Sequence, residues 1–140
     1  MLPLRLVIDT NVLVSAALKP AGLQRTVLLL AITKPGRLYV SQPILREYGD
    51  VLGRPELGIR KGLRRQLLQL IKNRSYTVAP MQSLEVTTDP DDNIFVECAD
   101  AARADYLVTG NQKQFPKFWK KTKVITPREF ISLGAPHLMK

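Results

Sequence analysis

The sequence predicts an α/β fold in which a central parallel sheet is covered by helices on both faces. Short runs of branched apolar residues, typical of buried strands, alternate along the chain with longer segments in which apolar residues recur at helical spacing. This alternation favours a parallel sheet, because each connection between parallel strands crosses a face of the sheet as a helix. The expected strands are residues 4–8, 38–40, 76–79, 105–109 and 124–125.

The segments between these strands carry ordinary signals for the start and end of a helix. The polar residues 9–11 start the first helix, and Pro20 and Gly22 end it. Pro43 lies in the first turn of another helix, where its missing N–H is not needed. The remaining expected helices are residues 23–33, 41–53, 61–72 and 92–103, with a last one opened by Pro127 that runs through residue 131.

Composition and charge limit the class of protein. The 140 residues include 21 Lys or Arg and 12 Asp or Glu, giving a formal charge of +9. A basic chain of globular composition favours a polyanionic partner, usually nucleic acid, although lysines that serve only solubility are an alternative. The longest apolar run, residues 27–32, is far shorter than a membrane span, and Cys98 alone cannot form an intramolecular disulfide. We therefore expect a cytoplasmic protein with one domain over residues 1–140, its core at about 4–131 and a C-terminal tail at 132–140.

Four polar residues that are far apart in the sequence are expected at one edge of the sheet. In parallel sheets the functional groups gather beyond the carboxyl ends of the strands. Asp9 directly follows the first strand, and Asn111 lies two residues beyond the strand at 105–109. Glu47 borders the apolar stripe of the helix after the second strand, and Asp92 shares the inward face of the helix that leads into the strand at 105–109. Asp105 starts that strand, so we expect it at the opposite edge in a structural role.

This grouping of oxygen ligands predicts a site for a hard divalent cation. Crowded carboxylates repel one another and raise one another's pKa, and either a shared proton or a bound divalent cation makes such crowding tolerable. Oxygen ligands without His or Cys at metal-binding spacing favour Mg²⁺ or Mn²⁺ over zinc. Each residue singly has a simpler explanation: Asp9 as a helix cap, Glu47 as a surface residue, and Asp92 as a charge favoured by a helix dipole. Their shared location favours the metal site, and with it a metal-dependent nuclease in which a metal-activated water attacks a phosphodiester.

Two blocks of the sequence resemble PIN-domain ribonucleases. The first is Val-Ile-Asp-Thr-Asn-Val-Leu-Val-Ser-Ala at residues 7–16, which is similar to the opening motif of that family. The second joins Asp-Pro-Asp-Asp-Asn at 89–93 to Ala-Asp-Tyr-Leu-Val-Thr-Gly-Asn at 104–111, and resembles the subgroup that serves as toxins of toxin–antitoxin pairs. The resemblance runs from about residue 4 to residue 130.

The resemblance implies a three-layer α/β/α sandwich that holds Mg²⁺ or Mn²⁺ and cleaves RNA. The acidic positions of the family match Asp9, Glu47 and Asp92 as metal ligands, and Asn111 occupies a fourth position that is usually acidic. Asn11 and Thr109 match positions that support the site. The resemblance also implies a homodimer and an antitoxin protein as partner. Because Asn111 brings no charge, we expect weaker metal binding than in members with four acids; a catalytically inactive RNA-binding module and a scaffold that acts through a protein partner are the alternatives.

A basic and aromatic segment follows Asn111 directly. Lysines on phosphates combined with aromatic faces under bases are a common way to hold single-stranded nucleic acid. Phe115 and Trp119 are also well explained as core residues with lysines around them. The lysines that we expect to contact RNA are Lys113, Lys117 and Lys120.

Overall fold

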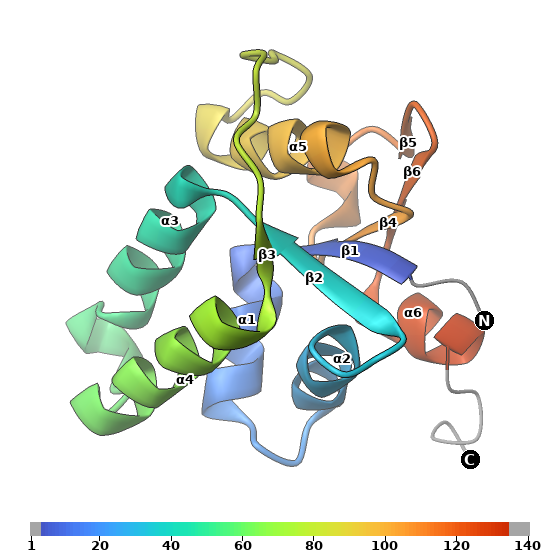
Figure 1. Cartoon of the computed structure of the whole chain (residues 1–140). Coiled ribbons are helices and arrows are strands. Elements are labelled where there is room, and N and C mark those ends of the chain that lie inside the picture. Colours follow the sequence, from blue (N-terminus) through green and yellow to red (C-terminus); the bar gives the residue numbers. More distant parts are fainter. Residues whose placement is uncertain (1–3, 135–140) are drawn as a thin grey trace.

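The computed structural model describes residues 4–134 and contains a six-stranded sheet (Figure 1). The strands lie in the order β3-β2-β1-β4-β6-β5, and all neighbours are parallel except β5 and β6. Their bounds are β1 Leu4–Ile8, β2 Gly36–Val40, β3 Tyr76–Thr77, β4 Tyr106–Val108, β5 Phe118–Trp119 and β6 Thr122–Ile125. The expected parallel sheet is therefore confirmed, with one antiparallel strand added at its edge.

Helices cover both faces of the sheet, as the sequence predicts. Their bounds are α1 Thr10–Leu18, α2 Leu23–Ala31, α3 Gln42–Leu52, α4 Lys61–Arg74, α5 Pro90–Ala102 and α6 Pro127–Gly134. Helix α5 packs on β1, β2 and β4 from one side, and Figure 1 shows α1 and α2 on the other. Helix α2 packs against α6 as well as β2. This three-layer arrangement places the carboxyl ends of β1 and β4 side by side, because Ile8 pairs with Val108.

Local signals fix where three of the helices begin. The Ser41 hydroxyl accepts a hydrogen bond from the backbone N–H of Ile44 at the start of α3. The Asp89 carboxylate caps α5 by accepting from the N–H of Asp91. At α6, Thr126 and Glu129 exchange side-chain to backbone hydrogen bonds at 3.1 Å, which is a capping box. These caps set the entry of α3 and α5, the helices that carry Glu47 and Asp92.

The structure differs from the expected elements in a few places. Helix α5 begins at Pro90, two residues before the expected start, because Asp89 is its cap and proline suits the first turn. Strand β2 begins at Gly36, where the chain passes so close to the end of α2 that a Cβ atom would overlap the carbonyl oxygen of Leu30. Strand β5 and two short 3-10 helices, η1 Pro55–Leu57 and η2 Gln112–Gln114, were not expected.

The apolar core lies between the sheet and its two helix layers. Leu6, Leu38 and Leu107 are buried in the central strands, and Phe95 of α5 is buried against them. Cys98 is a buried free cysteine, as expected for a small apolar side chain. No single helix in residues 4–134 is long and apolar enough to cross a membrane; α1 and α2 meet that test only together, with a bend of 118° between them.

Candidate functional site

Asp9 lies at the centre of the candidate site, at the carboxyl end of β1. Its backbone N–H donates to the carbonyl of Val108 at 3.0 Å, which joins the end of β1 to the end of β4. Its carboxylate oxygen Oδ2 accepts from the Thr109 hydroxyl at 2.7 Å and from the Asn11 amide at 3.1 Å. Burial raises the pKa of Asp9, while the bonds from Thr109 and Asn11 act in the opposite direction. The structure thus brings Asn11 and Thr109 onto the first acid.

Glu47 reaches the same edge from α3. The hydroxyl of Thr10 donates to its Oε2 at 2.5 Å. Two neighbouring residues at the β1–α1 junction therefore bind the two carboxylates: Thr10 binds Glu47, and Asn11 binds Asp9. The adjacent Tyr48 is buried and donates its phenol O–H to the backbone carbonyl of Ile8, which fixes α3 to β1. Burial, followed by the charges of Asp91 and Asp9, raises the pKa of Glu47; the hydrogen bond from Thr10 lowers it.

Asp92 approaches from the first turn of α5 and is half-buried. Its pKa is raised to about 6, first by burial and then by the charge of Asp9, with further contributions from Asp89, Glu47 and Asp91. The charges of Asp9 and Glu47 therefore both act on Asp92. The three carboxylates share one electrostatic environment, although they come from three separate elements.

The loop before α5 positions Asp92. The side-chain oxygen of buried Asn93 accepts from the backbone N–H groups of Val86 and Thr87 and from the Thr87 hydroxyl. Further along the helix, the Glu97 carboxylate accepts from the N–H of Leu84. These bonds attach the segment before the helix to the helix itself. The sequence analysis did not identify Asn93, although a buried asparagine directly after two aspartates is a local signal for such an anchor.

Asn111 follows β4 on the exposed side of the site. The backbone N–H of Asn111 donates to the Thr109 hydroxyl at 2.9 Å, and the N–H of Gly110 donates to the side-chain oxygen of Asn11 at 3.0 Å. Thr109 therefore connects Asn111 to Asp9 through one hydroxyl. Asn11 and Asn111 both line a small polar pocket of about 340 Å³ beside the β1–α1 junction.

The donor set suits a hard cation, but the side chains are not yet gathered around one point. Carboxylate and amide oxygens are chemically appropriate ligands for Mg²⁺ or Mn²⁺. Within residues 4–134, however, no three His, Cys, Asp or Glu side chains are grouped closely enough to hold a metal ion. Binding would therefore require side-chain rotation from the arrangement described here.

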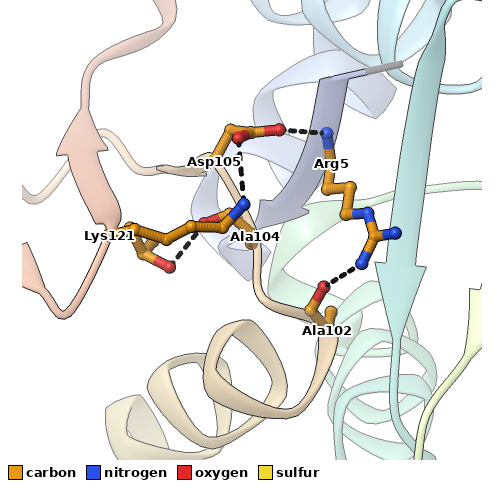
Figure 2. A network of polar contacts seen from close by, with 6 residues as sticks. Arg5, Ala102, Ala104, Asp105 and Lys121 are labelled. Carbon is orange, nitrogen blue, oxygen red and sulfur yellow. Dashed lines mark hydrogen bonds and ion pairs between the residues drawn. The ribbon is translucent and has the colours of Figure 1, made fainter. Parts of the chain in front are cut away.

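Asp105 lies at the other end of β4, in agreement with the structural role expected from its position (Figure 2). Its carboxylate accepts from the backbone N–H of Arg5 at 2.8 Å and pairs with Lys121 at 3.4 Å. The guanidinium of Arg5 donates to the carbonyl of Ala102 at 3.1 Å. This network joins the start of β1, the end of α5 and the turn before β6, well away from Asp9.

The three lysines expected to contact RNA fall into two groups. Lys113 and Lys117 line a cavity on the outer edge of the sheet together with Phe118. Lys120 instead pairs with Asp100 of α5 at 2.7 Å and lies over the Trp119 ring. Lys123 belongs to the same basic segment but is not one of the three lysines expected to contact RNA; it lines the same cavity as Lys113. Phe115 is buried and Trp119 half-buried, as core packing predicts, whereas Phe118 is exposed.

Comparisons with known proteins find a relative in sequence and a solved structure with a similar fold. An uncharacterized protein of Methanocaldococcus jannaschii, MJ1680, is 31% identical to this chain over 140 residues, covering 91% of this chain and 90% of the relative. A chain in the crystal structure of VapBC2 from Rickettsia felis, bound to a DNA fragment from their promoter, superposes with a TM-score of 0.60 over 88% of this chain and 98% of the other. At 17% identity that likeness establishes the fold.

The family model of the PIN domain matches residues 5–113. This range includes β1, the helices α3 and α5, and β4, so it contains Asp9, Glu47, Asp92 and Asn111. The match extends over most of the chain, and the fold and the polar edge of the sheet agree with it. The chain belongs to the PIN domain family.

Proposed function

We propose that this protein is an endoribonuclease that depends on Mg²⁺ or Mn²⁺ and hydrolyses RNA phosphodiester bonds. PIN domains are generally nucleases and typically use divalent metals. The observation that carries the proposal is electrostatic: burial first, and then the charges of Asp9, Asp89 and Glu47, raise the pKa of Asp92 to about 6. An accumulation of negative charge of this kind is stabilised by a bound cation.

In this proposal Asp9, Glu47 and Asp92 hold the cation. A divalent cation supplies two effects when bound, a lower pKa for water and stabilisation of charge on the phosphate. The hydroxyl of Thr109 and the amide of Asn11 orient the Asp9 carboxylate, and the hydroxyl of Thr10 orients Glu47. These hydrogen bonds favour the ionised carboxylates that a metal requires.

Asn111 extends the set of oxygen ligands without adding charge. Its backbone N–H donates to the Thr109 hydroxyl, and this bond fixes the position of the Asn111 backbone beside Asp9. We propose that its amide oxygen orients a water molecule or a phosphate at the exposed side of the site. Three carboxylates in place of four make metal binding weaker, and Asn111→Asp is expected to tighten it.

Cleavage of a fluorescent RNA, together with metal titration by calorimetry, tests the proposal. We expect cleavage in Mg²⁺ or Mn²⁺, loss of cleavage with chelator, and loss of both cleavage and metal binding in Asp9→Asn. Asp50→Asn is the matched control, because it removes one exposed carboxylate from α3, the helix that carries Glu47. If Asp9→Asn cleaves RNA as well as the parent does, the assignment is wrong.

The same measurements separate the two alternatives. RNA binding without cleavage, in both the parent and Asn111→Asp, would identify a binding module. Absence of both binding and cleavage would leave a scaffold that acts through a protein partner. Because a basic surface that binds RNA releases counterions, the affinity of a true RNA binder falls steeply with salt.

We further propose that the protein is the toxin of a toxin–antitoxin pair. The motifs of the sequence and the likeness to a chain of VapBC2 support an antitoxin protein as partner. We propose that this activity is cytoplasmic, as expected for an enzyme that acts on RNA. Growth arrest on expression, relieved by co-expression of a candidate antitoxin but absent with Asp9→Asn, is the expected result. The homodimer that the resemblance implies is measured by light scattering after size exclusion.

A further inference from the structure

A cavity with cationic and aromatic walls lies along the outer edge of the sheet. Its volume is about 450 Å³, and its walls include Lys113, Lys117, Lys123 and Phe118. Buried Phe115 contributes to the apolar part of the lining. The nuclease chemistry proposed above uses none of these side chains.

The pairing of β5 with β6 determines which side chains reach this cavity. Phe118 pairs with Lys123, and Trp119 pairs with Thr122. Directly opposed residues of an antiparallel pair project to the same face, and successive residues alternate between faces. Phe118 and Lys123 therefore share one face. Trp119 lies on the other, where its indole N–H donates to Asp100 of α5 at 3.0 Å.

Phe118 has the features of a stacking platform. In residues 4–134 it is the most exposed aromatic side chain, with 58% of its surface accessible. An exposed phenyl ring contributes little to folding, because most of its apolar surface stays in water. The same cavity is lined by Lys113 of η2, Lys117 directly before β5 and Lys123 of β6.

The cavity is positively charged, with one acidic group at its margin. Lys113, Lys117 and Lys123 supply three positive charges, and all three are exposed. Glu129 of α6 lies near Lys123; the hydrogen bond from the Thr126 backbone is the main cause that lowers the pKa of Glu129, and the charge of Lys123 adds to it. The Glu129 carboxylate is already bound by the N–H of Thr126 and by the side-chain amide of Gln112. The balance of charge therefore favours a polyanion.

The residues that line the cavity begin in the sequence directly after the candidate metal site. Gln112, which immediately follows Asn111, lines the cavity, and its side-chain amide is fixed to the carbonyl of Val124 at 3.0 Å. Asp9 and Phe118 are separated by three strand spacings and three residue steps along the sheet, which amounts to roughly 17 Å. A polynucleotide strand of a few nucleotides covers that distance.

We propose that this cavity is a subsite for single-stranded RNA, in which one base stacks on Phe118 while Lys113, Lys117 and Lys123 contact the flanking phosphates. The inference rests on the proposed nuclease function for its choice of substrate and deepens it by naming the strand type. In a duplex the bases already stack on one another, so no base is free to cover Phe118. Stacking on an aromatic face requires no particular base, so the subsite selects unpaired RNA and not a sequence.

Fluorescence anisotropy with a 5′-labelled oligouridylate of about ten nucleotides, measured in EDTA, tests the subsite. This length lies within the ~4–16 nucleotides that single-strand sites commonly cover. Without metal the assay reports binding alone, so it is independent of cleavage. We expect Phe118→Ala to weaken binding about fivefold or more and Phe118→Trp to retain it, since stacking of a base on one aromatic ring contributes at least that order of affinity. Duplex RNA of the same length is expected to bind Phe118→Ala and the parent equally well.

The double variant Lys117→Gln/Lys123→Gln tests the electrostatic part of the subsite. We expect it to weaken binding of both RNAs and to reduce the slope of log affinity against log salt by about 1.4 for the single strand. The matched control is Lys61→Gln/Lys72→Gln, which removes two lysines from the separate basic cluster on α4. Thermal unfolding confirms that each variant folds.

The possible results distinguish the subsite from the nuclease. If Phe118→Ala binds the oligouridylate like the parent, or if the α4 pair weakens binding as much as the cavity pair, the subsite proposal is wrong, and this face is left for a protein partner. If the cavity variants lose binding while the parent cuts no RNA in Mg²⁺ or Mn²⁺, the subsite is supported and the proposed nuclease function fails.

Discussion

Replacing Asp92 with asparagine is expected to stabilise the metal-free protein at neutral pH. The folded-state pKa of Asp92 is about 6, above its ordinary value of 3.8. Between these two pH values the folded state binds more protons than the unfolded state, so the free energy of unfolding decreases as the pH rises through this window. Above pH 6 the ionised Asp92 is a net cost to folding, and an uncharged asparagine removes that cost.

The size of the effect follows from the pKa shift of Asp92, from its screening by water, and from the opposing effect of the helix dipole. A shift of about two pH units corresponds to about 3 kcal/mol as an upper bound. Because Asp92 is half-buried, screening by water reduces this to roughly 1–1.5 kcal/mol. The carboxylate also lies in the first turn of α5, where the helix dipole favours it by about 0.3–1 kcal/mol. The expected net stabilisation is therefore roughly 0–1.2 kcal/mol at pH 7.5.

Urea unfolding in EDTA at several pH values measures this difference. The advantage of Asp92→Asn over the parent should be largest at pH 7.5, decrease by about half near pH 5, and vanish below the ordinary pKa of 3.8, where Asp92 is protonated in both the folded and the unfolded parent. Asp50→Asn makes the same change in net charge on an exposed side chain and should show no such pH profile. A variant that is less stable than the parent at pH 7.5, or a difference that does not change with pH, would refute the reasoning.

Three further predictions concern the contacts around Asp9. Thr109→Val removes a hydroxyl at 2.7 Å from the Asp9 carboxylate; we expect a loss of about 1–3 kcal/mol in urea unfolding and weaker Mg²⁺ binding by calorimetry, and unchanged metal affinity would contradict it. Tyr48→Phe leaves the buried carbonyl of Ile8 without its donor, which should destabilise the protein by about 1–3 kcal/mol in the same assay; a fully stable variant would show that the anchor contributes nothing. Mg²⁺ at 100 times its dissociation constant should stabilise the parent by about 2.7 kcal/mol in thermal unfolding but leave Asp9→Asn unchanged, and an equal shift in both would place the ion elsewhere.

The sequence is informative about the site wherever a residue is positioned by its own strand or helix. Asp9 follows a short apolar run that can only be a buried strand, and Asp92 lies on the apolar face of its helix. Their positions at the ends of these elements follow from local periodicity and the rule for parallel sheets. The start of α5 could also have been found, because Asp89 followed by Pro90 is a cap and first-turn signal.

Contacts between distant segments are not predictable in this way. The bond from Thr10 to Glu47 joins residues 37 positions apart, and the bond from Tyr48 to Ile8 joins residues 40 apart. Strand β5 has two residues, too few for any period to show. The separation of Phe118 from Trp119 depends on the register of that strand with β6, which a single sequence does not contain.

The bond between Tyr48 and Ile8 has a consequence for how the three carboxylates can move. It fixes the residue after Glu47 to the residue before Asp9, so α3 cannot shift without breaking a buried hydrogen bond. Within residues 4–134 no side-chain hydrogen bond joins Asp92 to β1; α5 is held on the sheet by packing, and its polar anchors run to the half-exposed segment before it. Asp9 and Glu47 are thus held in fixed positions relative to each other. The movement that would bring the three carboxylates together around a metal ion therefore falls to Asp92.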